Sequence, residues 1–179
     1  MNEYEQLHVA AIVHAEDDSA DGLLVDFARD LRARGWHVHG VVQTDAGCVD
    51  GCAPQMILTD LDDGNQFIIS QFLGSGSDSC SVDPAGIAAA SGALRRGLAE
   101  RADLVIANRF GKLEMTGGGF TAEMLALMAS GVPFLTVVAH RFLDDWRRFT
   151  GNAATELPPR REALEAWFAG LPPREKMGP

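Results

Sequence analysis

The chain has 179 residues, 46% of them hydrophobic, and a formal net charge of −10 at pH 7. These values are typical of one globular domain, predicted to span residues 1–179 with an ordered core over about residues 7–170. No apolar run approaches the roughly 20 residues that cross a bilayer, and the acidic start of the chain is unlike a signal peptide. A cytoplasmic location without a membrane span is therefore expected.

The negative charge is concentrated in the first third of the chain. Residues 1–63 contain 13 acidic residues and 3 arginines, and the remainder is neutral overall. A nucleic-acid-binding domain would need a basic patch, so nucleic acid is not an expected partner. The simplest role of the acidic part is solubility.

The first elements predict a βαβ unit. The apolar run 7–14 predicts a buried strand, residues 23–34 carry apolar side chains at helical spacing before Gly35, and residues 36–43 predict a second strand. A strand, a helix and a strand within about 40 residues indicate parallel strands joined by a right-handed crossover.

The remaining elements extend the same sheet. Residues 56–61 and 65–72 predict two strands that the turn 62–64 (Asp-Asp-Gly) joins as a hairpin. Asp83 is the expected N-cap of a helix. The later elements are expected in this order: helix 84–101, strand 104–107, helix 121–130, strand 134–138, and helices 140–149 and 161–168. This order predicts a three-layer α/β fold with a mostly parallel sheet and a β-hairpin insertion over residues 54–72.

The strand over residues 104–107 is predicted to deliver Asn108 and Arg109 to its C-terminal end. In P-loop nucleoside-triphosphatases this position carries the acid that holds Mg²⁺, often followed by one that polarises water. Neither residue is acidic here. The strand therefore has the position of a nucleotide-hydrolysis strand without its chemistry.

The first loop departs from a phosphate-binding loop in a similar way. The pattern Gly-x-x-x-x-Gly-Lys-Ser/Thr wraps phosphates with backbone N–H groups and neutralises them with Lys. Here Ala15 and Ala20 replace the glycines, Asp21 replaces the lysine, and Gly22 replaces the hydroxyl residue. A carboxylate about 4 Å from a phosphate costs on the order of 1–4 kcal/mol, so hydrolysis of magnesium-bound nucleoside triphosphates is not expected.

The acidic residues of this loop allow two other interpretations. Four acidic residues could coordinate a hard cation through oxygen, although they lack the regular spacing of a calcium loop: Glu16, Asp17, Asp18 and Asp21. Alternatively, Ser19 or Asp18 caps the following helix and Asp21 lies in its favourable first turn.

Three motifs carry a resemblance to known proteins. They are Gln-x-x-Gly-x-Gly-Ser at residues 71–77, Cys-x-x-Asp-Pro at 80–84 and Asn-x-Phe-Gly-Lys-Leu-Glu at 108–114. By these motifs the chain resembles a bacterial family of uncharacterised proteins. By its order of elements it resembles the small P-loop nucleoside-triphosphatases of the cancer-related NTPase type, with degenerate Walker A and Walker B motifs. Members of the bacterial family are often associated with molybdate transport or molybdenum enzymes. The resemblance implies molybdate or tungstate as the ligand and molybdenum-pathway proteins as partners.

The polar residues that follow the predicted strand 104–107 are suited to binding a small anion. Arg109 and Lys112 could bind an oxyanion, with Asn108 as a neutral hydrogen-bond donor, at the sheet edge where open α/β proteins place ligands. The alternative is that Arg109 pairs with Asp18 or Asp21 and has a structural role.

Two loops could complete such a site. The glycines Gly117 and Gly118 could add backbone N–H groups, and hydroxyl groups could form a second wall, from Ser75, Ser77 and Ser79. The alternative is that both loops only connect elements.

The cysteines suggest neither a disulfide framework nor a metal centre. Cys48, Cys52 and Cys80 are an odd number, and the first two have no second paired Cys or His motif to complete a zinc site. No Ser/His/Asp or Cys/His pattern assigns a catalytic residue.

The sequence therefore favours a non-hydrolytic binding or accessory protein for a small anion. The alternative is a divergent nucleoside-triphosphatase in which Asp17, Asp18 or Asp21 holds Mg²⁺ and Glu114 is the base. A protein-interaction module with an empty site is a third hypothesis.

Overall fold

The computed structural model describes residues 7–16, 20–46, 55–71 and 81–173. Its central feature is a seven-stranded sheet in the order β4-β3-β2-β7-β8-β1-β9. The strands are β1 (Val9–His14), β2 (Val38–Ala46), β3 (Gln55–Asp60), β4 (Gln66–Ile68), β7 (Leu104–Phe110), β8 (Phe134–Ala139) and β9 (Thr155–Leu157). Every pairing within the series β2-β7-β8-β1-β9 is parallel. The pairings of β3 with β2 and of β4 with β3 are antiparallel. The prediction of a mostly parallel sheet is confirmed.

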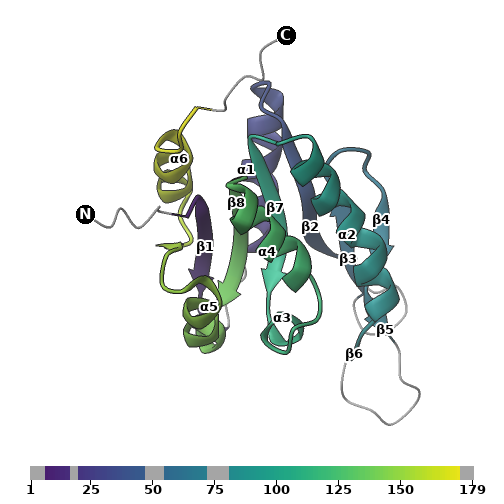
Figure 1. Cartoon of the computed structure of the whole chain (residues 1–179). Helices are drawn as coiled ribbons and strands as arrows, with labels where there is room; N and C mark the ends of the chain where they lie inside the picture. The colour runs from purple at the N-terminus through teal and green to yellow at the C-terminus, as the bar shows by residue number, and fades with distance from the viewer. Residues whose placement is uncertain (1–6, 17–19, 47–54, 72–80, 174–179) are drawn as a thin grey trace.

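Helices cover both faces of this sheet (Figure 1). One face packs against α1 (Asp21–Ala33) and α6 (Arg161–Ala169), and the other against α2 (Pro84–Ala99), α4 (Thr121–Ser130) and α5 (Leu143–Thr150). The fold is thus the three-layer α/β architecture that the sequence predicts, and it is P-loop NTPase-like.

Strand β7 shows how one apolar run serves two cores. Leu104 and Ile106 are buried with α1 and α6, whereas Val105 and Ala107 are buried with α2 and α4. Successive side chains of a strand point to opposite faces, so a strand covered on both faces is continuously apolar. This is why the sequence of β7 lacks the alternation of a half-exposed strand.

The β-hairpin insertion is present as β3 and β4, which extend the sheet beyond β2. The turn between them is closed by a hydrogen bond from the Asp60 N–H to the Asn65 carbonyl at 2.8 Å. The prediction of one strand over 65–72 is wrong, because the chain leaves β4 at Ile69, which is buried in the same core as Ile87 of α2. Beyond it, β5 (Ser70–Gln71) and β6 (Ser81–Val82) form a separate two-stranded sheet.

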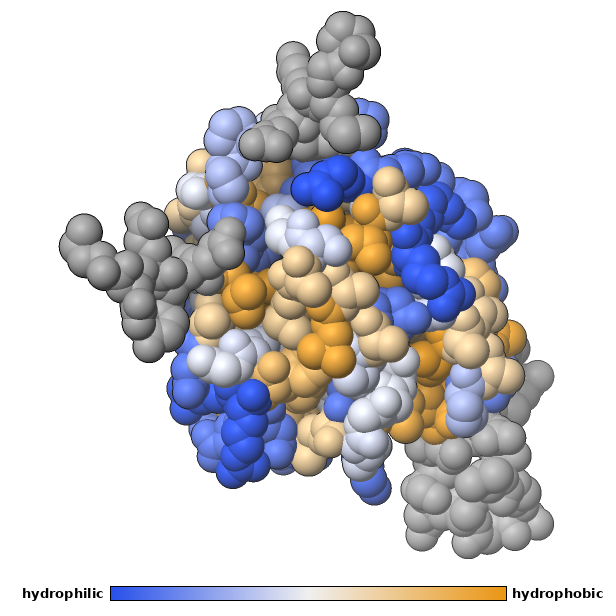
Figure 2. Space-filling view, in the orientation of Figure 1, coloured by the Kyte–Doolittle hydropathy of each residue, from blue (hydrophilic) through white to orange (hydrophobic). Residues whose placement is uncertain are grey.

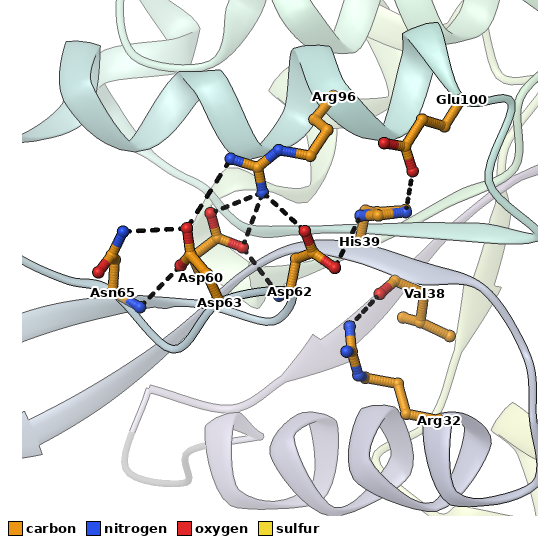
Figure 3. Close-up of polar contacts among 9 residues, drawn as sticks. All are labelled: Arg32, Val38, His39, Asp60, Asp62, Asp63, Asn65, Arg96 and Glu100. Atoms are coloured by element: carbon orange, nitrogen blue, oxygen red, sulfur yellow. Dashed lines mark hydrogen bonds and ion pairs between the residues drawn. The ribbon is translucent and has the colours of Figure 1, made fainter.

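Arg96 of α2 fixes this hairpin to the body of the domain (Figure 3). Its guanidinium lies 3.1 Å from an oxygen of Asp60 and 3.3 Å from one of Asp62, with Asp63 at 4.0 Å. The hydrogen bond to Asp60, followed by the charge of the same carboxylate, raises the pKa of Arg96. Asp60 has a side chain that is only 2% exposed, so Arg96 supplies the charge that its burial requires. We call these four residues the Arg96 cluster.

The outer surface of α4 is apolar. Ala122, Leu125 and Ala129 are exposed on it, and Leu125 retains 49% of its accessible surface. Met115 of the short helix α3 (Lys112–Met115) is 41% exposed. Figure 2 shows apolar residues gathered on this side of the molecule. Most surface helices carry charged side chains on the outward face, so α4 is unusual among the helices of this fold.

Three short elements had no counterpart in the prediction: β6, β9 and α3. The first turn of the predicted helix 140–149 is instead a 3₁₀ turn at His140–Phe142, and α5 follows it. The Asp83 carboxylate accepts a hydrogen bond from the Ala85 N–H at 3.0 Å, which confirms the predicted N-cap of α2. None of the helices in the described residues combines the length and hydropathy that crossing a bilayer requires.

Candidate functional site

The candidate site lies at the carboxyl ends of β1, β8 and β7, which are neighbours in the sheet. The register places His14 opposite Ala139, and Val138 opposite Phe110. From β1 the chain continues to α1 on one face, whereas from β8 it continues to α5 on the other. In open α/β sheets, ligands bind where adjacent parallel strands diverge in this way.

Strand β7 contains a bulge at this edge. Ala107 pairs with Thr136 and Phe110 pairs with Val138, so Asn108 and Arg109 together lie opposite one residue of β8. The peptide bond between Asn108 and Arg109 is cis. The prediction that both residues follow the strand is therefore wrong: β7 continues to Phe110, because Phe110 returns to the core. Bulges re-aim side chains and are frequent beside active sites.

Asn108 is buried in this bulge, with 1% of its surface exposed. Neither the oxygen nor the nitrogen of its side-chain amide has a hydrogen-bond partner within the described part of the chain. The Nε of Arg109 also lacks one among these residues. Buried polar groups are nearly always hydrogen-bonded, so unpartnered atoms on two consecutive residues point to a ligand or water.

Arg109 forms an ion pair with Asp21, as expected if its role were structural. Its Nη2 lies 2.8 Å from Oδ2 of Asp21, in the first turn of α1. The N-cap of α1 is Ala20, and the predicted caps Ser19 and Asp18 lie outside the described residues. Asp21 is instead the acidic residue that interacts favourably with the helix dipole.

Glu114 is not free to act as a base in this conformation. Its carboxylate is buried, and it accepts hydrogen bonds from the N–H groups of Gly111 at 2.9 Å and Phe120 at 3.1 Å. Burial raises the pKa of Glu114, although the hydrogen bonds from Gly111 and Phe120 oppose the shift. The sequence motif therefore marks a carboxylate around which the loop from β7 to α4 is folded.

The glycines of this loop serve the loop itself. The N–H of Gly117 donates to the carbonyl of Glu114 at 3.2 Å, and the N–H of Gly118 donates to the carbonyl of Leu113 at 2.9 Å. The prediction that these two N–H groups face a ligand is wrong. Gly119, the third glycine of this run, has φ +59°, and a Cβ there would lie 2.1 Å from the Glu114 carboxylate.

Lys112 is exposed on α3, and its side chain makes no hydrogen bond or ion pair with the rest of the described chain. Its ammonium group is thus available to bind a solute near the bulge. Asp17, Asp18, Ser75, Ser77 and Ser79 lie outside the described residues, as do Cys48, Cys52 and Cys80. Within the residues that are described, no three His, Cys, Asp or Glu side chains are placed to hold a metal ion.

The described side chains are thus suited to binding. The bulge offers amide and guanidinium donors, and Lys112 adds a positive charge within the same segment. One residue that sequence reasoning missed supports this geometry: buried Thr136 donates a hydrogen bond from Oγ1 to the Ala107 carbonyl at 2.5 Å, at the last regular pair before the bulge. Its place in an apolar strand is the only sequence signal for this role.

The fold and the site define a three-layer α/β protein of P-loop NTPase-like architecture. The chain belongs to the family described as Protein of unknown function (DUF2478), whose model matches residues 9–167. It is 38% identical over 174 residues to the Molybdenum import ATP-binding protein ModC 2 of Bradyrhizobium diazoefficiens, an alignment that covers 97% of this chain and 19% of that protein. The chain therefore spans about a fifth of the length of this curated relative. No solved structure matches the chain.

Proposed function

We propose that this protein is a non-hydrolytic accessory protein of molybdenum metabolism that binds a small oxyanion, such as molybdate or tungstate, at the bulge of β7. The observation that carries the proposal is the pair of consecutive residues, Asn108 and Arg109, with buried polar atoms that lack partners in the described structure. Both supply N–H donors, and an oxyanion offers several acceptors to such a set.

Nucleotide hydrolysis is the less favoured function because the phosphate-binding end of α1 already holds a negative charge. Asp21 is in the first helical turn, where backbone N–H groups and the helix dipole favour an anion. Its carboxylate and a triphosphate would compete for the same N–H groups and for Arg109. Glu114, the base of the hydrolytic hypothesis, is occupied by two backbone N–H groups.

The similarity to a molybdenum import protein supports the link to molybdenum metabolism. That relative is named for ATP binding, but the aligned segment is about a fifth of its length. This chain has no phosphate-binding loop sequence. This chain is therefore poorly suited to bind ATP, and a role beside an ATP-binding protein fits it better.

Thermal unfolding in the presence of candidate ligands tests the proposal. Molybdate, tungstate, sulfate, phosphate, MgATP and MgGTP are compared on the same protein. A ligand at 100 times its dissociation constant adds roughly 2.7 kcal/mol to the free energy of unfolding. We expect stabilisation by molybdate and tungstate but not by the magnesium nucleotides.

Two variants locate the binding. Lys112→Ala and Asn108→Leu should weaken it, whereas Arg95→Ala, which removes an exposed cation of α2 far from the bulge in sequence, should not. Stabilisation by MgATP or MgGTP instead of the oxyanions would replace the proposal with the nucleotidase hypothesis. Equal losses in all three variants would indicate that binding depends on net charge and not on the bulge.

A further inference from the structure

A cavity of about 600 Å³ lies at the opposite end of the sheet from the bulge. It is formed where β1, β7 and β8 begin and is bordered by α6 and the segment 171–173. This volume is within the range of small-molecule sites, which are mostly apolar with a few placed polar groups. None of the residues proposed for the oxyanion site lines it.

Two aromatic side chains form one wall of this cavity. Trp36 and Phe168 pack edge to face, with ring centroids 5.1 Å apart. Trp36 is 45% exposed, and it follows Gly35, which has φ +90° and reverses the chain after α1. Val132, Pro133 and Leu171 add apolar surface. A half-exposed indole at the mouth of an apolar cavity offers a face on which a flat ring can stack.

The charged groups around the cavity differ in whether they are already paired. Arg34 and Glu165 form an ion pair at 3.1 Å. Burial raises the pKa of Glu165, but hydrogen bonds from Arg161 and Arg34 outweigh it, so the pKa is below its ordinary value. The Asp103 carboxylate accepts a hydrogen bond from the His37 N–H at 2.9 Å.

Arg101 is the exception among these groups. It lines the cavity, and its guanidinium makes no hydrogen bond or ion pair with any residue that the structure describes. Its guanidinium is therefore available to donate charge-assisted hydrogen bonds to an anionic group of a ligand. Arginine also stacks on aromatic rings, which suits the same ligand.

We propose that this cavity is a second binding site, which takes a flat aromatic molecule bearing one anionic group such as a carboxylate or sulfonate. The ring lies against Trp36 and Phe168, and the anionic group binds Arg101. The site is separate from the proposed function at the bulge and does not depend on it.

Anilinonaphthalene sulfonate is a suitable probe because it combines a flat aromatic body with one negative charge. Its fluorescence on titration with the folded protein should show saturable binding at one site per chain. Arg101→Ala should weaken the binding about tenfold or more, by loss of a charge-assisted contact. Ala169→Trp, which fills the cavity from α6, should abolish it.

The apolar surface of α4 is the competing location for the dye, and Arg95→Ala is the matched control for it. Arg95 pairs with Glu123 of α4 and does not line the cavity, so this variant should bind the probe like the wild type. The uncharged N-phenylnaphthylamine should bind at least about tenfold more weakly than the sulfonate. Equal losses in Arg95→Ala and Arg101→Ala, unchanged binding in Ala169→Trp, or equal affinity for the uncharged dye would each overturn the proposal. Circular dichroism confirms that each variant is folded.

Discussion

Nη2 of Arg109 and Oδ2 of Asp21 lie 2.8 Å apart and join the bulge of β7 to the first turn of α1. The two residues are 88 positions apart in the sequence. A carboxylate of the chain thus occupies the helix end that would otherwise attract an external anion, and it takes one side of the guanidinium proposed to bind one. For the oxyanion site that we propose, this ion pair is therefore expected to weaken binding.

Replacement of Asp21 by Asn should strengthen oxyanion binding. The substitution removes a negative charge near the proposed anion and leaves Arg109 free to bind it. A charge at about 4 Å is worth on the order of 1–4 kcal/mol, so an increase in molybdate affinity of roughly tenfold or more is expected. Isothermal titration of both proteins measures it. A loss of affinity would show instead that Asp21 holds Arg109 in its binding orientation.

Asn108→Leu should stabilise the ligand-free protein while removing oxyanion binding. Leucine is close in shape to asparagine and has no polar atoms to leave unpartnered in the bulge. The free energy of unfolding should rise by about 1 kcal/mol, because an unsatisfied buried polar group costs about that much or more. Urea denaturation without ligand gives the change. A clear destabilisation would mean that the amide has a hydrogen-bond partner in solution, and the binding hypothesis would lose its main support.

The Glu114 carboxylate should be important for stability. Glu114→Gln replaces an acceptor oxygen with an NH₂ group that faces a backbone N–H, so it should lower the free energy of unfolding by about 2 kcal/mol. Gly119→Ala should also destabilise, because its Cβ would lie 2.1 Å from the carboxylate.

Gly117→Ala is the control for this steric clash. Gly117 has φ +85°, but a methyl group on its Cα would have nothing within 4 Å, so this variant reports the backbone strain alone. In thermal or urea unfolding, Gly119→Ala should be less stable than Gly117→Ala. Equal stabilities would show that the loop relaxes away from Glu114 without cost.

The pH dependence of stability should carry the signature of Glu114. Burial raises its pKa above the ordinary value of 4.5. Between 4.5 and the raised pKa the folded state binds more protons than the unfolded state, so the contribution of Glu114 to the free energy of unfolding falls as the pH rises through this range. The difference between wild type and Glu114→Gln should therefore be larger at about pH 5 than at about pH 7, in urea denaturation at both values. A larger difference at the higher pH would contradict the direction of the shift.

Removal of Arg96 should destabilise the hairpin far more than removal of its neighbour Arg95. Arg96→Ala leaves the buried Asp60 carboxylate without a cation and should lower the free energy of unfolding by about 2 kcal/mol. This loss is smaller than for a fully buried pair because the Arg96 side chain is 35% exposed. Arg95 is 63% exposed and pairs with Glu123, so its loss should cost less than about 1 kcal/mol. Asp60→Asn in the Arg96→Ala background should recover stability. A double variant no more stable than Arg96→Ala would show that the lost packing of Arg96 outweighs its charge.

The parts of the fold with strong local signals were predictable. The helix over 121–130 and the hairpin turn at 62–64 were predicted where they occur, because helical apolar spacing and an Asp-Gly turn are local properties of the chain. Strand β9 was missed because its three residues pair with β1, and that pairing is determined by the tertiary fold.

The site was predictable only as a location. The carboxyl ends of parallel strands meet at one edge of the sheet, so the sequence could group Asp21 with Asn108 and Arg109. The Arg109–Asp21 ion pair was one of the alternatives considered. The burial of Asn108 could not be predicted, since it follows from a bulge whose register depends on β8. The sequence also could not show that the N–H groups of Gly117 and Gly118 bond within the loop, because these bonds depend on how the chain folds around Glu114.

Both edges of the main sheet end in strands of three residues, β4 on one side and β9 on the other. An exposed strand edge is a template for pairing with another chain, and the risk grows with the length of the edge. The hairpin that the Arg96 cluster fixes replaces the long edge of β2, a strand of nine residues, with one of three. The insertion therefore shortens the edge through which the sheet could pair with another chain, and a mutation that loosens the Arg96 cluster would expose a β2 edge three times as long.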